Sequence, residues 1–246
     1  QAAFFGPLKY SIIPQLVHQD QLTTGNALIE SGTFLSILIG TILGGVLIEI
    51  EYGFIYLTIL SVLSGLIGLL SSWFIPKAPS SYTDAKVDYN IFRQTKEILK
   101  IAYENEPVFK SILAISWFWF LGAVLITEFP VLIRDNIGGS PMLVTIFLSI
   151  FSIGVIVGAY ISDRLSFGKV EIGLVPLGAL GIVIALIDFT LTLSNFTHLN
   201  SESLKDFIYT DNSLRIVLDL FVLSIFGGLF TVPLYAFLQE ATEADV

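Results

Sequence analysis

The chain has 246 residues, of which 54% are hydrophobic and 13% charged, with a mean hydropathy of +0.81. Soluble domains carry about 25% charged residues, so this composition indicates a membrane protein. The net charge of −9 argues against nucleic-acid binding, and zero Cys with only two His leaves no expected metal or cofactor site.

Six apolar segments are long enough to cross a bilayer as helices, which takes about 20 residues each. Each must be helical, because backbone groups facing hydrocarbon have no water to bind. They lie at roughly 26–50, 53–75, 108–133, 141–162, 171–195 and 214–238. Residues 1–13 have the composition of the last turns of an earlier span. We expect Thr24-Gly25-Asn26 and Ser140-Pro141 to begin two of the helices.

Lys and Arg are distributed unequally between the two sets of connections, which predicts the orientation of the chain. One set, together with residues 1–13, contains nine of them, and the other contains three. This asymmetry places the stretch 14–25, the loop 76–107, the turn near Asp163 and the C-terminal end in the cytoplasm.

The segment 76–107 divides the apolar spans into two groups. Its second half has apolar residues at helical spacing, among them Phe92, Ile98 and Leu99, and a face that carries Arg93 and Lys96. The pattern predicts an amphipathic helix. Two settings remain open, a helix lying on the cytoplasmic leaflet and a soluble connector.

Small residues recur at four-residue spacing within the spans, as in the series Gly32, Ser36, Gly40 and Gly44 and the pair Gly154 and Gly158. In lipid, such ridges let backbones approach closely, so they predict helix–helix contacts. Channels and membrane enzymes share this pattern with transporters.

Charged residues interrupt two apolar runs in SDRLSFGKVEIGLVP (162–176). The stretch resembles the turn that major facilitator transporters carry after the second helix of a three-helix repeat. The resemblance implies a latch that holds the cytoplasmic side closed. In this latch, the Asp lies at the N-terminal end of a neighbouring helix, and the basic residues pair with carboxylates of that helix. Alternatively, the basic residues only set topology. The latch positions are Gly158, Asp163, Arg164, Gly168 and Lys169, with Ala159 where the family pattern has Gly.

Further stretches resemble the bacterial lysophospholipid transporter subgroup of the same superfamily. They are FFGPLKYSIIPQL (4–16), TGNALIESGTFLSILIGTILGG (24–45), SWFWFLGAVLITEFP (116–130), SFGKVEIGLVPLGALG (166–181) and FGGLFTVPLYAFLQE (226–240).

The resemblance implies an all-α polytopic membrane protein with the major facilitator fold, two six-helix bundles. Residues 1–75 would form part of the N-terminal bundle, with the end of span 4 and spans 5 and 6. Residues 76–107 would form a cytoplasmic inter-bundle loop, and 108–246 would form spans 7–10 of the C-terminal bundle. Because the chain starts with Gln inside an apolar stretch, we expect a fragment truncated at both ends.

Ionisable groups within a span cost roughly 2.5–3.5 kcal/mol each on insertion scales, so each is a candidate site. Glu30 can line a substrate cavity, take up a proton, anchor a gate or reach the membrane interface. Asp219 is expected to pair with Arg215, four residues earlier, on the surface. The candidates for a substrate or proton cavity are Glu30, Thr33, Thr41, Trp117, Glu128 and Asp188.

The predicted function is secondary transport of lysophospholipid across the bacterial inner membrane, by alternating access of the two bundles. One alternative is a drug–proton antiporter or another small-molecule transporter. Another is the transporter portion of a bifunctional protein fused to acyltransferase and acyl-carrier-protein ligase domains. The expected partners are membrane lipid, an amphipathic or lysophospholipid substrate and, in the fusion, an acyltransferase. We find no catalytic constellation and expect no enzyme activity in this chain.

Overall fold

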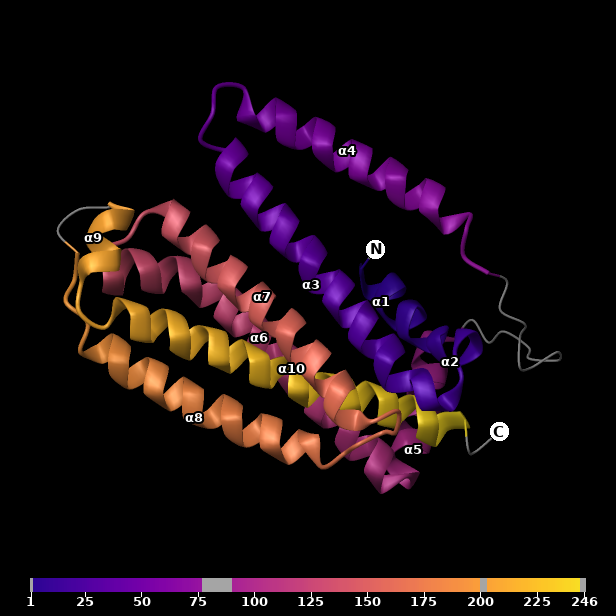
Figure 1. Ribbon diagram of the computed structural model, residues 1–246. Helices are drawn as coiled ribbons and strands as arrows, with labels where there is room; N and C mark the ends of the chain where they lie inside the picture. Colours follow the sequence, from indigo (N-terminus) through magenta and orange to yellow (C-terminus); the bar gives the residue numbers. More distant parts are fainter. Residues whose placement is uncertain (1, 77–89, 200–202, 244–246) are drawn as a thin grey trace.

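The computed structural model describes residues 2–76, 90–199 and 203–243, and every regular element in them is a helix (Figure 1). The short elements are α1 (Ala2–Ser11), α2 (Ile13–Leu16), a 3₁₀ turn (Gln19–Gln21), α5 (Ile91–Glu104), a π-helical turn (Leu132–Ile137) and α9 (Leu204–Tyr209). The long helices are α3 (Leu22–Leu47), α4 (Gly53–Ser72), α6 (Glu106–Val131), α7 (Pro141–Ser166), α8 (Leu174–Ser194) and α10 (Ser213–Glu243).

Six helical stretches are long and apolar enough to cross a membrane, as the sequence predicts. Ser140 precedes α7 in an extended conformation and Pro141 begins the helix, although the Ser140 side chain makes no capping hydrogen bond. The predicted cap at Thr24-Gly25-Asn26 is wrong, because α3 already begins at Leu22. The Asn26 amide donates to the carbonyl of Leu22, and the Thr24 hydroxyl donates to Asp163 of α7, so neither side chain caps α3.

The helices of residues 106–243 pack around α10, which lies between α7 and α8 with α6 behind it (Figure 1). Glycines permit this packing. A Cβ at Gly158 would come within 2.0 Å of the Ile225 carbonyl oxygen, and one at Gly178 within 2.8 Å of the Phe230 nitrogen. Aromatic residues such as Phe129 and Phe147 fill the interior between the helices. This packing agrees with the contacts predicted from small residues in α7.

Within the described residues, the small-residue ridge of α3 makes no such contact. Cβ atoms at Gly32, Gly40 and Gly44 would meet nothing within 4 Å in the described chain. The contact between α3 and α7 is made instead by Gly45, where a Cβ would lie 2.3 Å from the Thr145 hydroxyl oxygen. Among the described residues, α3 thus packs on α7 through Gly45, and contacts of its small-residue ridge stay a prediction.

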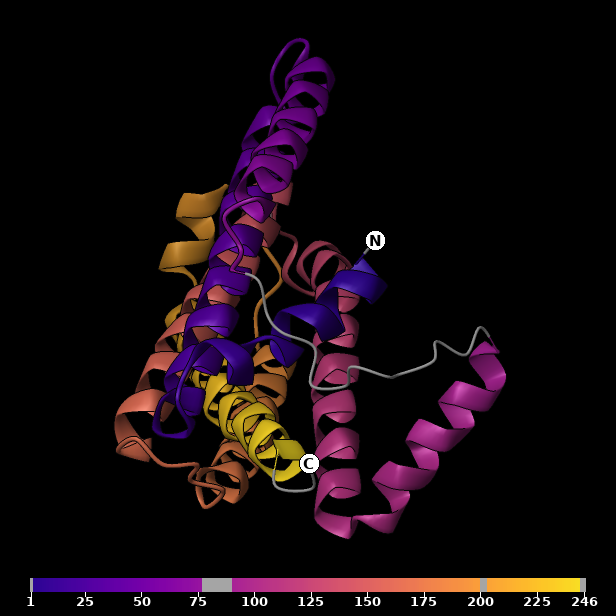
Figure 2. The same ribbon diagram turned by 90° about the vertical axis from the view of Figure 1, so that its right-hand side faces the viewer.

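The segments predicted to be cytoplasmic lie at one end of the molecule: α2, α5, the turn between α7 and α8, and the C-terminal end of α10 (Figure 1). The opposite end holds α9 and the connection between α6 and α7. Helix α5 confirms the predicted helix after residue 90, with Asn90 accepting a hydrogen bond from the Arg93 backbone nitrogen. It extends away from the start of α6 and from α3 and α4 (Figure 2). Most of the predicted linker before it, residues 77–89, lies outside the described residues.

Candidate functional site

A cavity of about 890 Å³ lies between α1, α5, α6 and α10. It therefore joins the predicted N-terminal bundle, which contains α1, to the predicted C-terminal bundle, which contains α6 and α10. Ligand pockets measure about 300–1,000 Å³, and this cavity has that size. Its apolar wall includes Ile98, Ile101, Ile112 and Leu238, and its polar edge is formed by Lys9, Tyr10, Ser11, Trp119, Tyr235 and Gln239.

A chain of four side chains crosses between the bundles at this polar edge. The Tyr10 hydroxyl donates to Glu30 Oε2 of α3 over 2.6 Å. The Tyr10 ring stacks on Tyr235 of α10, with centroids 4.0 Å apart and ring planes 3° from parallel. Trp119 Nε1 of α6 donates to the Tyr235 hydroxyl over 2.8 Å. These three contacts connect α3 and α1 to α10 and α6.

A pair of amides makes a second connection between the bundles. Asn26 Nδ2 donates to Gln239 Oε1 over 2.6 Å, and Gln239 Nε2 donates to Asn26 Oδ1 over 3.1 Å. Gln239 Nε2 also lies 3.0 Å from the Tyr10 carbonyl oxygen. Both amide side chains are buried. Apolar contacts accompany this pair, because Leu22 and Ala27 of α3 lie in buried clusters with Ala236 and Val232 of α10.

Lys9 supplies a positive charge to the cavity. Its Nζ donates to Thr33 Oγ1 over 2.8 Å and lies 4.8 Å from the centre of the Tyr10 ring. It also lines a neighbouring hollow of about 640 Å³ along α3, which includes Thr33 and Ser36. A cation beside aromatic rings and an apolar wall suits an amphipathic ligand with a negative group.

Two of the residues predicted for a substrate or proton cavity, Glu30 and Thr33, accept hydrogen bonds from side chains of α1. Glu30 lies two turns inside α3 and is only 1% exposed. Its Oε1 has no hydrogen-bond partner in the described chain. Thr41 lies further along α3, half-buried and away from α1.

Trp117 and Glu128 share one face of α6, as predicted, but not the face that carries Trp119. Nine residues separate Trp119 from Glu128, which turns the carboxylate about 180° around the helix. Glu128 is exposed, and Trp117 packs edge-on against Phe230 with centroids 6.0 Å apart. These two residues therefore lie apart from the cavity beside Lys9.

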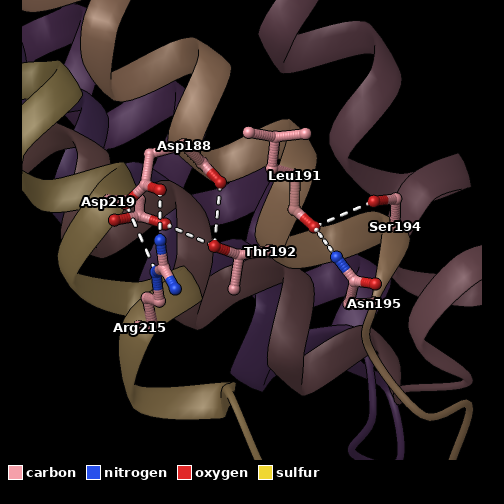
Figure 3. Close-up of polar contacts among 7 residues, drawn as sticks. All are labelled: Asp188, Leu191, Thr192, Ser194, Asn195, Arg215 and Asp219. Carbon is pink, nitrogen blue, oxygen red and sulfur yellow. Dashed lines mark hydrogen bonds and ion pairs between the residues drawn. The ribbon is translucent and has the colours of Figure 1, made fainter.

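Asp188 belongs to a separate cluster near the opposite end of the molecule (Figure 3). The predicted pairing of Arg215 with Asp219 is wrong, because Arg215 forms an ion pair with Asp188 of α8 instead. Asp219 is almost buried and accepts a hydrogen bond from Thr192 Oγ1 over 3.2 Å. The cluster joins α8 to α10 within one predicted bundle.

The turn between α7 and α8 contacts the start of α3, where the sequence places the latch. Asp163 Oδ1 accepts a hydrogen bond from Thr24 Oγ1 over 2.5 Å, within the first turn of α3. The Lys169 carbonyl accepts one from Thr23 Oγ1 over 3.3 Å. An aspartate beside a helix N-terminus is stabilised by the helix dipole. Gly168 forms the turn with φ +72°.

The basic latch residues do not reach a carboxylate in the described chain. Arg164 donates from Nε to the Tyr160 hydroxyl over 2.9 Å, one turn back on its own helix. Gly158 does not face α3 but packs on the Ile225 backbone of α10, and Ala159 beside it is fully buried. Close packing of α7 on α10 explains why small residues occupy both positions.

Sequence reasoning missed most residues of the polar edge and of the amide pair: Lys9, Tyr10, Asn26, Trp119, Tyr235 and Gln239. One signal was available. Tyr235 and Gln239 are four residues apart, so they share a face of an otherwise apolar helix. Lys9 entered the sequence analysis only as one of the basic residues that predict the orientation of the chain. Its position within the apolar residues 1–13 could have marked it as a candidate.

The helices and the cavity define a multi-pass helical membrane protein with a partly polar cavity between its helices. The family model described as "Major Facilitator Superfamily" matches residues 2–245. The chain therefore belongs to this superfamily, and its all-α polytopic fold agrees with the prediction.

Curated relatives carry the name "Lysophospholipid transporter LplT". The proteins from Photorhabdus laumondii, Yersinia enterocolitica and Cronobacter sakazakii are 27%, 26% and 26% identical to this chain. The matches cover 100% of this chain but 57%, 56% and 57% of the relatives. No solved structure matches.

Proposed function

We propose that this protein transports lysophospholipid across a bacterial inner membrane by alternating access. Residues 1–75 would rock against residues 108–246, with the segment 76–107 as their cytoplasmic link. The observation that carries the proposal is the cavity between the bundles, which combines an apolar wall with Lys9 at its polar edge. The names of the relatives supply the substrate class.

The cavity has complementary parts for a lipid with one acyl chain. The Lys9 ammonium pairs with the phosphate of the head group, an interaction that a low dielectric strengthens. The apolar wall formed by α5, α6 and the end of α10 receives the acyl chain, and each buried CH₂ contributes about 0.8 kcal/mol. Tyr235 and Trp119 offer rings with polar edges at the boundary between these parts.

The contacts of Asp163 and Lys169 with the first turn of α3 hold the end of the molecule that we assign to the cytoplasm closed. Opening that end requires Asp163 to leave Thr24. Replacing Asp163 by Asn keeps the size of the side chain but removes its charge, which weakens its attraction to the N-terminal end of α3. We therefore expect Asp163→Asn to favour the open arrangement and to slow transport.

Uptake of labelled lysophosphatidylethanolamine into spheroplasts that express the full-length gene product tests the proposal. We expect uptake by the wild type, and at least about a tenfold loss in Lys9→Gln, because one charged hydrogen bond accounts for that much. Glu128→Gln is the matched control, since Glu128 is exposed on the opposite side of α6 from Trp119. It should retain uptake.

Absence of uptake by well-expressed wild-type protein would contradict the lipid substrate. Proton-dependent export of drugs by the same cells would then favour the antiporter alternative. If uptake occurs only together with reacylation by the same polypeptide, the fusion alternative with an acyltransferase gains support.

A further inference from the structure

One apolar edge of α5 forms part of the cavity wall. It consists of Ile98, Ile101 and Ala102, which line the cavity together with residues of α1, α6 and α10. At about 100° per residue, these three side chains lie within a sector of about 100° on the helix. Ala102 is buried. The cavity therefore accounts for this side of α5.

A second apolar edge of α5 is exposed. It is formed by Phe92, Leu99 and Tyr103, which follow at helical spacing and therefore share one side of the helix. Phe92 is 89% exposed and Leu99 56%. Tyr103 packs edge-on against Phe109 of α6, with ring centroids 5.3 Å apart, and is otherwise exposed as well. A contiguous apolar surface of this kind marks a contact with lipid or with another protein.

Two lysines border this second edge. Lys96 lies one turn after Phe92 and one turn before Lys100, so two like charges are neighbours on the helix surface and repel each other. The Lys100 ammonium lies 3.6 Å from Glu104 Oε1, in a pair that is largely exposed and therefore weak. Phosphate groups next to both ammonium groups would offset the repulsion. The charges thus favour an anionic partner for the apolar edge.

The position of α5 in the molecule brings this surface to a membrane leaflet. Helix α5 lies at the end that we assign to the cytoplasm, beside the start of α6 (Figure 1 and Figure 2). The cytoplasmic leaflet has a negative surface potential, which attracts basic segments next to the spans. An amphipathic helix on such a surface buries its apolar residues at the boundary of the acyl chains, while its lysines reach the phosphates. Anionic lipid therefore matches both the apolar edge and the lysines beside it.

We propose that α5 is an interfacial helix that binds anionic lipids of the cytoplasmic leaflet, with Phe92, Leu99 and Tyr103 among the acyl chains and Lys96 and Lys100 at the phosphates. In this position the helix has lipid on one apolar edge and the cavity on the other. The lipids that it binds stay in the membrane, so this surface is distinct from the cavity proposed for transport. The proposal rests on the orientation of the chain and not on the transported substrate.

Electron paramagnetic resonance of single spin labels tests this position in full-length protein reconstituted in nanodiscs. One label is attached at Leu99→Cys, on the exposed apolar edge. The other is attached at Glu97→Cys, an exposed position about 160° away around the helix. Oxygen collides with labels in lipid, and a soluble nickel chelate collides with labels in water. We expect oxygen to reach the label at Leu99→Cys and the chelate to reach the label at Glu97→Cys.

Two outcomes of this experiment would overturn the proposal. If the nickel chelate reaches both labels equally, α5 is a soluble connector. If neither reagent reaches the label at Leu99→Cys, protein covers the apolar edge, either another part of the full-length chain or a second copy of it.

Lys96→Gln tests the contribution of charge. The discs contain the fraction of phosphatidylglycerol at which the label at Leu99→Cys is equally distributed between lipid and water. One Lys near an anionic surface accounts for about a fivefold change in binding, so Lys96→Gln should lower the ratio of lipid-exposed to water-exposed label about fivefold.

Lys205→Gln is the matched control, because it removes the same charge from α9 at the opposite end of the molecule. It should leave the ratio unchanged. An unchanged ratio in Lys96→Gln would overturn the proposal. Because the readout is the position of α5, a failure of lysophospholipid uptake would contradict the proposed function without affecting this result.

Discussion

Helices α4 and α10 have the same mean hydropathy, 2.1 in their most apolar windows, but very different surroundings. In α10, 67% of that window is buried within the molecule, and in α4 only 6%. Hydropathy alone therefore predicts that both helices cross the membrane and says nothing about their packing. A helix that is apolar all round is stable when lipid or protein covers it.

The difference between the two helices comes from what their small residues meet. Gly228 of α10 faces the backbone of α7, where a Cβ would lie 2.5 Å from the Ala159 nitrogen. A Cβ at Gly65 or Gly68 of α4 would meet nothing within 4 Å among the described residues. Close packing thus follows from complementary surfaces on two helices, not from a pattern on one.

The largest expected effect is that of Gly158→Ala. The added methyl would lie 2.0 Å from the Ile225 carbonyl oxygen, so the backbones of α7 and α10 must move apart. We expect the free energy of unfolding to fall by about 3 kcal/mol, measured as the thermal stability of full-length protein in detergent.

Gly40→Ala is the corresponding change at a position where a Cβ would meet nothing within 4 Å among the described residues. It should leave stability unchanged or raise it by up to about 1 kcal/mol through helix propensity. Equal losses in Gly158→Ala and Gly40→Ala would contradict the contrast between packed and open glycines.

A smaller effect is expected from the amide pair between the bundles. Asn26→Ala removes both hydrogen bonds to Gln239 and leaves a buried amide with fewer partners. We expect a loss of about 2 kcal/mol in the free energy of unfolding. A double-mutant cycle with Gln239→Ala checks this, because a coupling energy near zero would show that the pair contributes nothing.

Trp119→Phe should have a still smaller effect, because it removes one hydrogen bond, the 2.8 Å contact to the Tyr235 hydroxyl, and keeps an aromatic ring. We expect a loss of about 1 kcal/mol in the free energy of unfolding. The matched change Trp117→Phe removes no hydrogen bond seen in the described chain and keeps the edge-on contact with Phe230. If both variants melt at the same temperature, the bond to Tyr235 is not stabilising.

The smallest expected effect on uptake is that of Asp188→Asn. Its ion pair with Arg215 joins α8 to α10 within one bundle and is largely exposed to the surroundings. Uptake of lysophosphatidylethanolamine should change by less than about twofold. A loss as large as that of Lys9→Gln would place Asp188 in the transport path after all.

The number, order and approximate bounds of the long helices could be predicted, because about 20 consecutive apolar residues have few alternatives to a spanning helix. Asp163 contacts the start of α3, and its role as a latch stays a prediction. The pairing of Tyr10 with Tyr235 could not be predicted, since it depends on how α1 and α10 approach each other in space. The ion pair between Arg215 and Asp188 was missed for the same reason. Arg215 binds Asp188 on the adjacent helix α8 and not Asp219, one turn away on its own helix.

Helix α10 contains Pro233, two residues before Tyr235. Proline cannot donate a backbone hydrogen bond and crowds the preceding turn, so a helix bends most readily there. About 30 Å of helix separates Arg215 at one end from Tyr235 at the other, at 1.5 Å per residue. The segment that carries Tyr235 and Gln239 thus lies beyond the position at which α10 bends most readily.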